Sequence, residues 1–246
     1  MNRFIHLHLQ IIFVLIGAPG FVFIDSPWFQ QHYFVGQDIN NVLMCLFYCW
    51  IFFTTADTKL YLLMMLITVV SFGAEICGSK ILTAYQYHLD NIPLFIPLGH
   101  AVVYATAYHI SRHDFVWKHH HIFEAALRKL AFIICFISLI LLNDIAGFFC
   151  YLLFLMLVAT RKKPLFYLTM YAVSYYLEFL GTVSSAWSYY FVLGNHPNYP
   201  PTSIIPCGIA GIYMFVDIVT NSIYLYIKKI KHYVSKNFKS PMTVAS

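Results

Sequence analysis

Three carboxylic acids lie within strongly apolar stretches of the chain, at Glu75, Glu178 and Asp217. A charged side chain at the centre of a bilayer costs about 2.5–3.5 kcal/mol on insertion scales, so such groups must face protein or an internal cavity. Loss of water favours the neutral form of a carboxyl, which can then act as a general acid near neutral pH. We therefore predict that these three acids are catalytic.

Aromatic residues follow each glutamate, as Tyr85-x-Tyr87 and as Trp187-x-Tyr189. Their π faces could line a cavity and stabilise a cationic intermediate. Alternatively, they could belong to the aromatic belt at a membrane surface. His100, His88 and His196 are predicted to lie near this cavity and could assist proton transfer. The residues predicted to bind substrate are Tyr85, Tyr87, Trp187, Tyr189, Tyr104, Tyr213 and Asn221.

Each acid belongs to a polar stripe on a predicted helix, because residues three or four positions apart share one helix face. The stripes are Thr68-Ser71-Glu75-Gly78-Ser79, Ser174-Glu178-Gly181-Thr182-Ser185 and Tyr213-Asp217-Asn221-Tyr224. The two glutamates are expected at similar depth, in a central cavity between two halves of the protein. Asp217 is expected to lie in the same cavity. Together with whichever glutamate does not act as the acid, it would position water or balance charge.

The composition indicates that these stripes lie in a membrane. Of the 246 residues, 60% are hydrophobic and 10% are charged, whereas soluble domains are about 45–50% apolar and about 25% charged. This balance excludes a cytosolic enzyme, a nucleic-acid-binding protein and a secreted disulfide scaffold. We predict an all-α polytopic membrane protein with about eight transmembrane helices. The expected spans are 4–24, 38–55, 59–82, 93–112, 124–142, 144–160, 164–187 and 204–227.

Charge placement predicts the orientation of these spans. If the N-terminus is cytoplasmic, 14 of the 15 basic residues lie on the inner side, and Lys80 is the exception. This agrees with the positive-inside rule and predicts a multi-pass protein of the inner or plasma membrane with both termini cytoplasmic. The first apolar run could pass for a signal peptide, but a retained helix is favoured. The basic segments are expected to contact anionic lipid headgroups.

The chain contains an internal repeat. Ser71-x3-Glu75-x2-Gly78-Ser79 reappears as Ser174-x3-Glu178-x2-Gly181-Thr182, and Ile96-Pro97-x-Gly99 reappears as Ile205-Pro206-x-Gly208. The glutamates are 103 residues apart, which maps the third and fourth spans onto the seventh and eighth. Because four is an even number, the two four-helix repeats, 1–122 and 123–246, should be parallel and form one membrane domain.

Histidines and cysteines offer competing sites. His109, His113 and the run His119-His120-His121 loosely resemble the histidine boxes of membrane di-iron enzymes, but no third box is found. A solvated basic loop is the favoured interpretation. The six cysteines fall in or beside apolar runs and form no C-x-x-C pair, so we expect them to be packing residues. No metal and no cofactor is predicted.

Short motifs around the glutamates resemble multi-pass carotenoid-biosynthesis membrane proteins that include bisanhydrobacterioruberin-type hydratases. They are Glu75-x2-Gly78 with Tyr85-x-Tyr87, and Glu178-x2-Gly181 with Trp187-x-Tyr189 and Pro206-x-Gly208. The resemblance covers about half of the chain. It implies a membrane enzyme that adds water across, or otherwise protonates, a carbon–carbon double bond of a long isoprenoid.

The leading hypothesis is therefore an intramembrane enzyme, a hydratase or isomerase, that uses acid/base chemistry on a polyisoprenoid or lipid. Glu178 or Glu75 would protonate an alkene, and Trp187 with Tyr85 would shield the cation. A proton-coupled or small-molecule transporter could use the same buried acids to bind a cation or a proton. A non-catalytic subunit of a membrane complex is the third alternative, since lipid-facing apolar surfaces also suit a protein partner.

Overall fold

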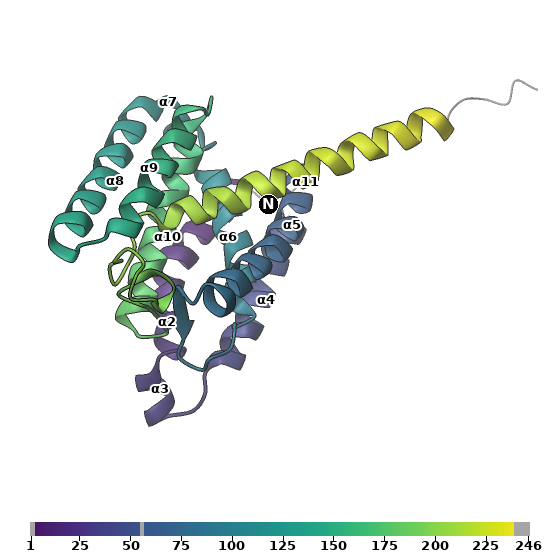
Figure 1. Cartoon of the computed structure of the whole chain (residues 1–246). Coiled ribbons are helices and arrows are strands. Elements are labelled where there is room, and N and C mark those ends of the chain that lie inside the picture. Colours follow the sequence, from purple (N-terminus) through teal and green to yellow (C-terminus); the bar gives the residue numbers. More distant parts are fainter. Residues whose placement is uncertain (1–2, 55–56, 239–246) are drawn as a thin grey trace, which may run out of the picture.

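The computed structural model describes residues 3–54 and 57–238 and confirms that these residues are mainly helical (Figure 1). Each of the eight predicted apolar runs contains a helix, although the run 204–227 becomes helical only at Ile209 and residue 55 of the run 38–55 lies outside the described residues. The first run is a rod of α1 (Arg3–Ile12), the π-helical η1 (Phe13–Gly17) and α2 (Ala18–Ile24). The later elements are α3 (Pro27–His32), α4 (Gln37–Thr54), α5 (Thr58–Glu75), η2 (Ile76–Ile81), β1 (Tyr85–Tyr87), α6 (Phe95–Ile110), α7 (Asp114–Lys118), α8 (His120–Leu142), α9 (Ile145–Ala159), α10 (Pro164–Val183), β2 (Trp187–Tyr189), η3 (Leu193–Asn195) and α11 (Ile209–Phe238).

Local sequence explains where several helices begin. Ser26 caps α3 by accepting a hydrogen bond from the Phe29 amide, and Pro27 follows at the first helical position. Asp144 caps α9 through the Gly147 amide, directly after Asn143 ends α8 in the left-handed conformation with φ of 53°. The α8–α9 connection is therefore a tight turn, and the two helices lie side by side.

The described helices pack into one body with two large apolar clusters, and a third, smaller cluster lies where the strands meet α2. One cluster lies between α4, α5 and α6, where Leu60, Leu63 and Met64 are fully buried. The other lies between α8, α9, α10 and α11 and contains Phe154 and Tyr171. The first half of α11 packs on α5, α9 and α10, and its second half projects from the body (Figure 1). The central helices α5, α6, α10 and α11 are thus held from both sides.

Within residues 3–54 and 57–238, three helical segments are long and apolar enough to cross a membrane by length and composition. They are Thr58–Ile81, His120–Leu142 and Ile209–Val234, while His8–Ile24 and Ile145–Ala159 are shorter apolar helices. Many large apolar side chains face outward, including Phe53 and Leu141, which are 75% and 74% exposed. This bears out a helical protein with membrane-capable segments and explains the low charge content.

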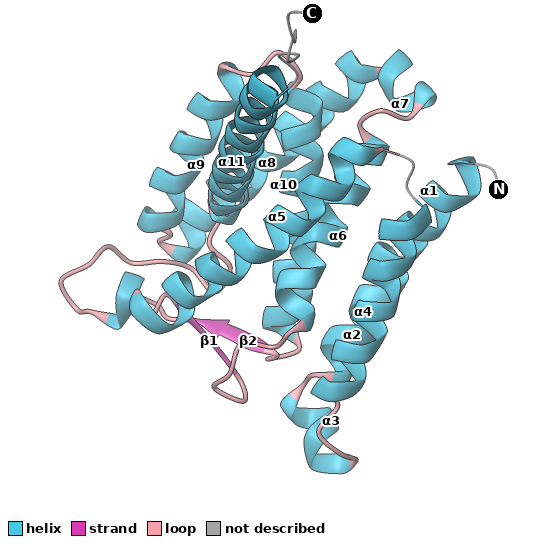
Figure 2. Ribbon diagram, turned by 90° about the vertical axis from the view of Figure 1, so that its right-hand side faces the viewer, coloured by secondary structure: helices cyan, strands magenta, loops and turns pink. Residues whose placement is uncertain are grey.

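A two-stranded antiparallel sheet differs from the all-helical expectation. Strands β1 and β2 pair with Tyr85 opposite Tyr189, and they lie at one end of the helical body (Figure 2). Each strand follows the end of a glutamate-bearing helix. Alternating aromatic residues suit a short strand, because the two-residue period puts them all on one face.

Candidate functional site

The two glutamates come from helices that reverse direction in the same way. The helix carrying Glu75 ends near Leu82, and Thr83 then takes a left-handed conformation with φ of 46°. After Glu178, Ser185 takes the same conformation with φ of 58°. Each reversal is fastened by a backbone hydrogen bond back to the preceding helix, from Ala84 to Gly78 and from Ala186 to Gly181. The strand that follows therefore returns beneath its own glutamate.

Glu75 is buried, and both of its carboxyl oxygens have hydrogen-bond partners. Its Oε2 accepts hydrogen bonds from the hydroxyls of Tyr85, at 2.5 Å, and Tyr87, at 2.7 Å. Its Oε1 lies 2.9 Å from His100 Nε2. Burial, and then the nearby Glu75 carboxylate, raise the pKa of Tyr85 well above its ordinary value, so this hydroxyl stays protonated and donates.

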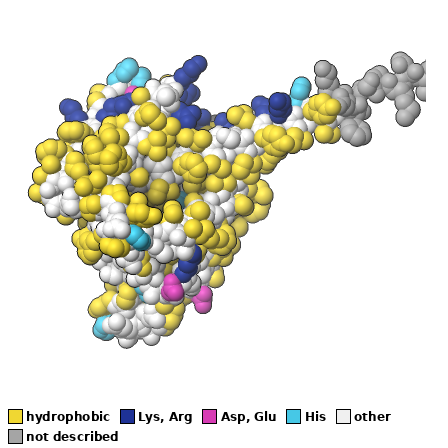
Figure 3. Space-filling view, in the orientation of Figure 1, with side chains coloured by type: hydrophobic (Ala, Val, Ile, Leu, Met, Phe, Trp, Pro, Cys, Tyr) yellow, Lys and Arg dark blue, Asp and Glu magenta, His cyan; other side chains and the backbone are white. Residues whose placement is uncertain are grey.

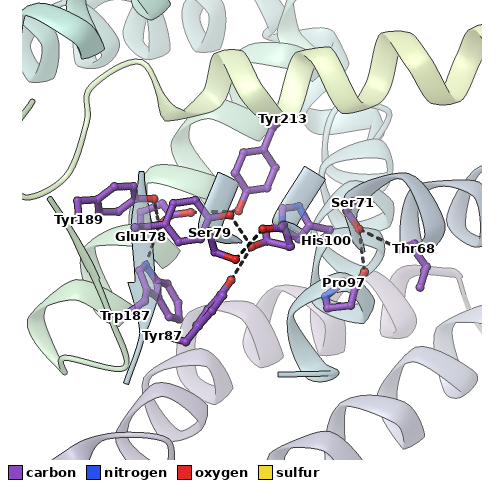
Figure 4. A network of polar contacts seen from close by, with 12 residues as sticks. Thr68, Ser71, Ser79, Tyr87, Pro97, His100, Glu178, Trp187, Tyr189 and Tyr213 are labelled. Atoms are coloured by element: carbon purple, nitrogen blue, oxygen red, sulfur yellow. Dashed lines mark hydrogen bonds and ion pairs between the residues drawn. The ribbon is translucent and has the colours of Figure 1, made fainter. Parts of the chain in front are cut away.

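Glu178 is equally buried but binds only neutral donors. Its Oε2 accepts from Trp187 Nε1, at 2.9 Å, and from the Tyr189 hydroxyl, at 2.7 Å. Its Oε1 has one long contact, 3.3 Å from the Tyr213 hydroxyl. Figure 4 shows these donors converging on Glu178 from the strand and from α11. The two carboxyls therefore differ, since one faces an imidazole and the other does not.

Two glycines allow the aromatic rings to reach the glutamates. A Cβ built on Gly181 would lie 2.0 Å from Trp187 Cζ2, and one built on Gly78 would lie 2.8 Å from Tyr85 Cε1. Real side chains do not approach so closely. The repeated glycines predicted from the sequence therefore leave space for the ring that donates to the neighbouring carboxyl.

Both glutamates line one cavity of about 110 Å³. His100, Tyr213 and the aromatic residues of both strands contribute its polar atoms. The remaining wall is largely apolar and includes Phe13 and Phe21 from the first helical rod. A mostly apolar cavity with a few convergent polar groups is the usual form of a small-molecule site. This cavity can hold an apolar group beside two carboxyls.

The structure brings seven predicted site residues together: Glu75, Glu178, Tyr85, Tyr87, Trp187, Tyr189 and Tyr213. Asp217, Asn221 and Tyr104 line a second cavity instead, so the expectation that Asp217 joins the glutamates needs correction. Asp217 accepts hydrogen bonds from Tyr167 and Asn221. The reason is the course of α11, on which Tyr213 faces the first cavity and the next turns face the second.

The three histidines expected near the cavity have different positions. His100 contacts Glu75 and stacks on Tyr213, with ring centroids 4.6 Å apart. His88 lies 3.9 Å from Asp25. The ring of His196 contacts that of Tyr199 in a tilted arrangement and does not line the described cavity.

Sequence reasoning missed the contribution of the first helical rod to the cavity wall. Phe13, Val14 and Phe21 lie in a segment whose sequence is apolar on all sides, so no periodicity marked the face toward the site. The six cysteines are free thiols, and only Cys135 and Cys207 among them are buried.

No family model, curated protein or solved structure matches this chain. The geometry of the site is the observation that bears on function. Glu75, Tyr85, Glu178 and Trp187 all line the same cavity.

Proposed function

We propose that this chain is an integral membrane enzyme that protonates a carbon–carbon double bond of a polyisoprenoid or similar lipid. The observation that carries the proposal is the pairing of Glu75 and Glu178 in one apolar, aromatic-walled cavity. Two carboxyls in unlike surroundings can divide the roles of acid and base between them. The motifs that resemble carotenoid-biosynthesis hydratases supply these carboxyls and their donors, which supports the same chemistry.

Glu178 is the proposed acid. Its Oε2 accepts two hydrogen bonds, whereas Oε1 has only the long contact with Tyr213 and has room for a proton. A second negative charge beside Glu75 is unfavourable, so the pair favours one shared proton. The alkene π electrons take this proton to form a C–H bond, leaving a carbocation and the Glu178 carboxylate. The rings of Trp187 and Tyr85 stabilise the cation.

Glu75 is the proposed base. It removes a proton from a neighbouring carbon when the outcome is isomerisation or cyclisation. For hydration, a water oxygen bonds to the cation and Glu75 takes the released proton. In each case the cycle closes when one proton passes from Glu75 back to Glu178, so no oxidant or reductant is required. His100 positions Glu75, and its buried Nδ1, which has no partner among the described residues, could hold the water.

The proposed setting is a multi-pass protein of the inner or plasma membrane with both termini cytoplasmic. Lys and Arg side chains gather at the end of the body that carries α7 and along α11, away from the strands (Figure 3), which supports this orientation under the positive-inside rule. Helix α10 has 20 residues and α4 has 18, which correspond to about 30 and 27 Å of helix. Such lengths suit crossing a hydrocarbon core about 30 Å thick.

The parallel duplication is part of this proposal. Position 86 pairs with position 188 at the centre of the sheet, and Tyr85 and Tyr87 pair with Tyr189 and Trp187. The repeat makes Tyr85 equivalent to Trp187 and Tyr87 equivalent to Tyr189. This is the register expected of two equivalent strands related by a two-fold axis, which supports two halves that meet at the glutamates.

Glutamine substitutions test the proposal. Glu178→Gln and Glu75→Gln keep the shape and one acceptor oxygen of each side chain but remove the proton chemistry. We expect cells carrying either variant to accumulate an unprocessed lipid precursor, measured in total lipid extracts. Glu124→Gln changes the one remaining glutamate of the sequence, which does not line the cavity, and should leave the lipids unchanged. Unchanged lipid profiles in both cavity variants would remove the catalytic assignment.

A further inference from the structure

A second cavity, of about 580 Å³, lies at the opposite end of α5 and α6 from the glutamates. Lys59 at the start of α5 lines it, whereas Glu75 ends the same helix 16 residues later. At 1.5 Å per residue the two cavities are thus separated by about 24 Å along α5. The chemistry proposed above makes no use of this second cavity.

Four cationic side chains line this cavity, and they come from three parts of the chain. Lys59 begins α5, Arg112 follows α6, and Arg161 and Lys163 lie in the connection before α10. Asp217 is the one carboxyl in the lining, and it already accepts hydrogen bonds from neutral donors. The formal charge of the lining is therefore strongly positive.

Aromatic rings, rather than carboxylates, lie beside three of these cations. Arg112 lies over Tyr108 at 3.5 Å, Lys163 over Trp117 at 5.3 Å and Arg161 over Tyr167 at 5.6 Å from the ring centroids. None of the ion pairs found among the described residues involves any of the four cations. A ring holds a cation in position without occupying its N–H donors, so these donors remain available to an anion.

Arg161 and the start of α10 add unoccupied donors. Arg161 Nε is buried and has no hydrogen-bond partner among the described residues, which is costly for a charged donor. Helix α10 has no side-chain cap, and Leu165 and Phe166 in its first turn line the cavity. The amide groups at a helix N-terminus favour an anion. Both observations favour the binding of an anion at this place.

We propose that this second cavity binds the phosphate group of a phosphorylated lipid. Arginine forks and lysines are the side chains that bind phosphate oxygens, and the cavity is of the size of known ligand sites. Phe166, Ile218 and Leu225 supply an apolar wall for the adjoining hydrocarbon. A membrane phospholipid and a prenyl phosphate both join an anionic phosphate group to hydrocarbon. Free phosphate has the anionic group without the hydrocarbon.

The test measures thermal stabilisation of the full-length purified protein in neutral detergent at physiological salt, where weak surface attraction is largely screened. The probes are phosphatidylglycerol, farnesyl phosphate and inorganic pyrophosphate, and each is titrated to give a dissociation constant. We expect at least one lipid probe to raise the melting temperature of the wild-type protein. Stabilisation by pyrophosphate as well would show that the phosphate group suffices, whereas stabilisation by one lipid alone would identify the source of the phosphate.

Matched variants decide whether the cavity is responsible. The double variant R161Q/K163Q should weaken binding about tenfold or more, because each hydrogen bond from a charged side chain to the phosphate contributes strongly to the free energy of binding. The control K228Q/K229Q removes the same charge from exposed positions on α11 and should leave binding within about twofold. If R161Q/K163Q does not fold, Lys59→Gln on the other wall makes the same comparison. The proposal is overturned if no probe stabilises the wild-type protein, or if the control weakens binding as much as the cavity variant.

Discussion

Tyr85 and Tyr189 lie directly opposite each other in the two-stranded sheet, with ring centroids 5.4 Å apart, yet their hydroxyls bind different glutamates. Tyr85 donates to Glu75 and Tyr189 donates to Glu178. The strand pairing therefore fixes the position of one carboxyl relative to the other. It also explains why three-residue strands occur in an otherwise helical chain.

Removing either hydroxyl should loosen this arrangement. Tyr85→Phe and Tyr189→Phe keep the ring but leave a buried carboxyl oxygen with one donor fewer. We expect each to lower the free energy of unfolding by about 1–3 kcal/mol, measured by denaturation in detergent. Tyr190→Phe is the control, because its hydroxyl binds Gln86 at an exposed site and its loss should cost about 0.5 kcal/mol or less. Equal effects at all three positions would contradict the conclusion that these two hydroxyls hold the carboxyls in position.

Gly181→Ala should disturb the site through Trp187. The added methyl group would overlap the indole ring, so Trp187 must move and lose its hydrogen bond to Glu178. We expect a loss of about 1–3 kcal/mol in stability, as for other overpacked sites, together with precursor accumulation in lipid extracts. Gly73→Ala is the matched control in α5, since nothing lies within 4 Å of its new Cβ. It should be neutral or stabilising by up to about 1 kcal/mol.

Much of this site was predictable from residue spacing. Helical periodicity placed the glutamates on polar stripes, and their repetition with identical spacing singled them out in an apolar chain. The aromatic residues that follow them were predicted to face the cavity, and the structure places them on its wall. These inferences succeeded because they depend on local geometry, which the sequence encodes within one or two turns of helix.

The features that depend on helix packing were not predictable in this way. Whether Asp217 shares a cavity with Tyr213 depends on how α11 crosses its neighbours, because residues one turn apart can face different spaces. The pairing of β1 with β2 joins segments about 100 residues apart, and three-residue strands leave little pattern. Arg161 and Lys163 fitted the positive-inside rule, which concealed their place in a cavity.

Asp25 should make stability depend on pH. It lies after the first helical rod and is only 2% exposed. Burial raises its pKa to about 7, although Gln37 opposes this shift. The folded protein holds the Asp25 proton more tightly than the unfolded chain. This stabilisation is therefore fully present below the pKa of the unfolded chain, which is about 4, and is lost as the pH rises through 7. A pKa shift of this size contributes at most roughly 4 kcal/mol to the free energy of unfolding.

Asp25→Asn should flatten this dependence. The melting temperature of the variant is expected to change little between pH 4.5 and 7 relative to the wild-type protein, apart from the contribution of other groups. Those include His88, whose pKa is lowered by burial and which opposes folding as the pH falls. Asp38→Asn removes an exposed carboxyl from the first turn of α4 and should preserve the wild-type slope. A wild-type slope in the Asp25 variant would assign the dependence to another group.

The proposed orientation places Asp90 and Lys162 on opposite sides of the membrane. Asp90 follows β1 and its side chain is 92% exposed, whereas Lys162 lies in the exposed connection between α9 and α10. With the six native cysteines replaced by alanine or serine, a cysteine at position 90 should react with an impermeant maleimide in intact cells. A cysteine at position 162 should react only after the membrane is opened. Three of the expected crossings, 93–112, 124–142 and 144–160, separate the two positions. Labelling of both from outside would therefore contradict this topology and require that α6, α8 or α9 does not cross the membrane.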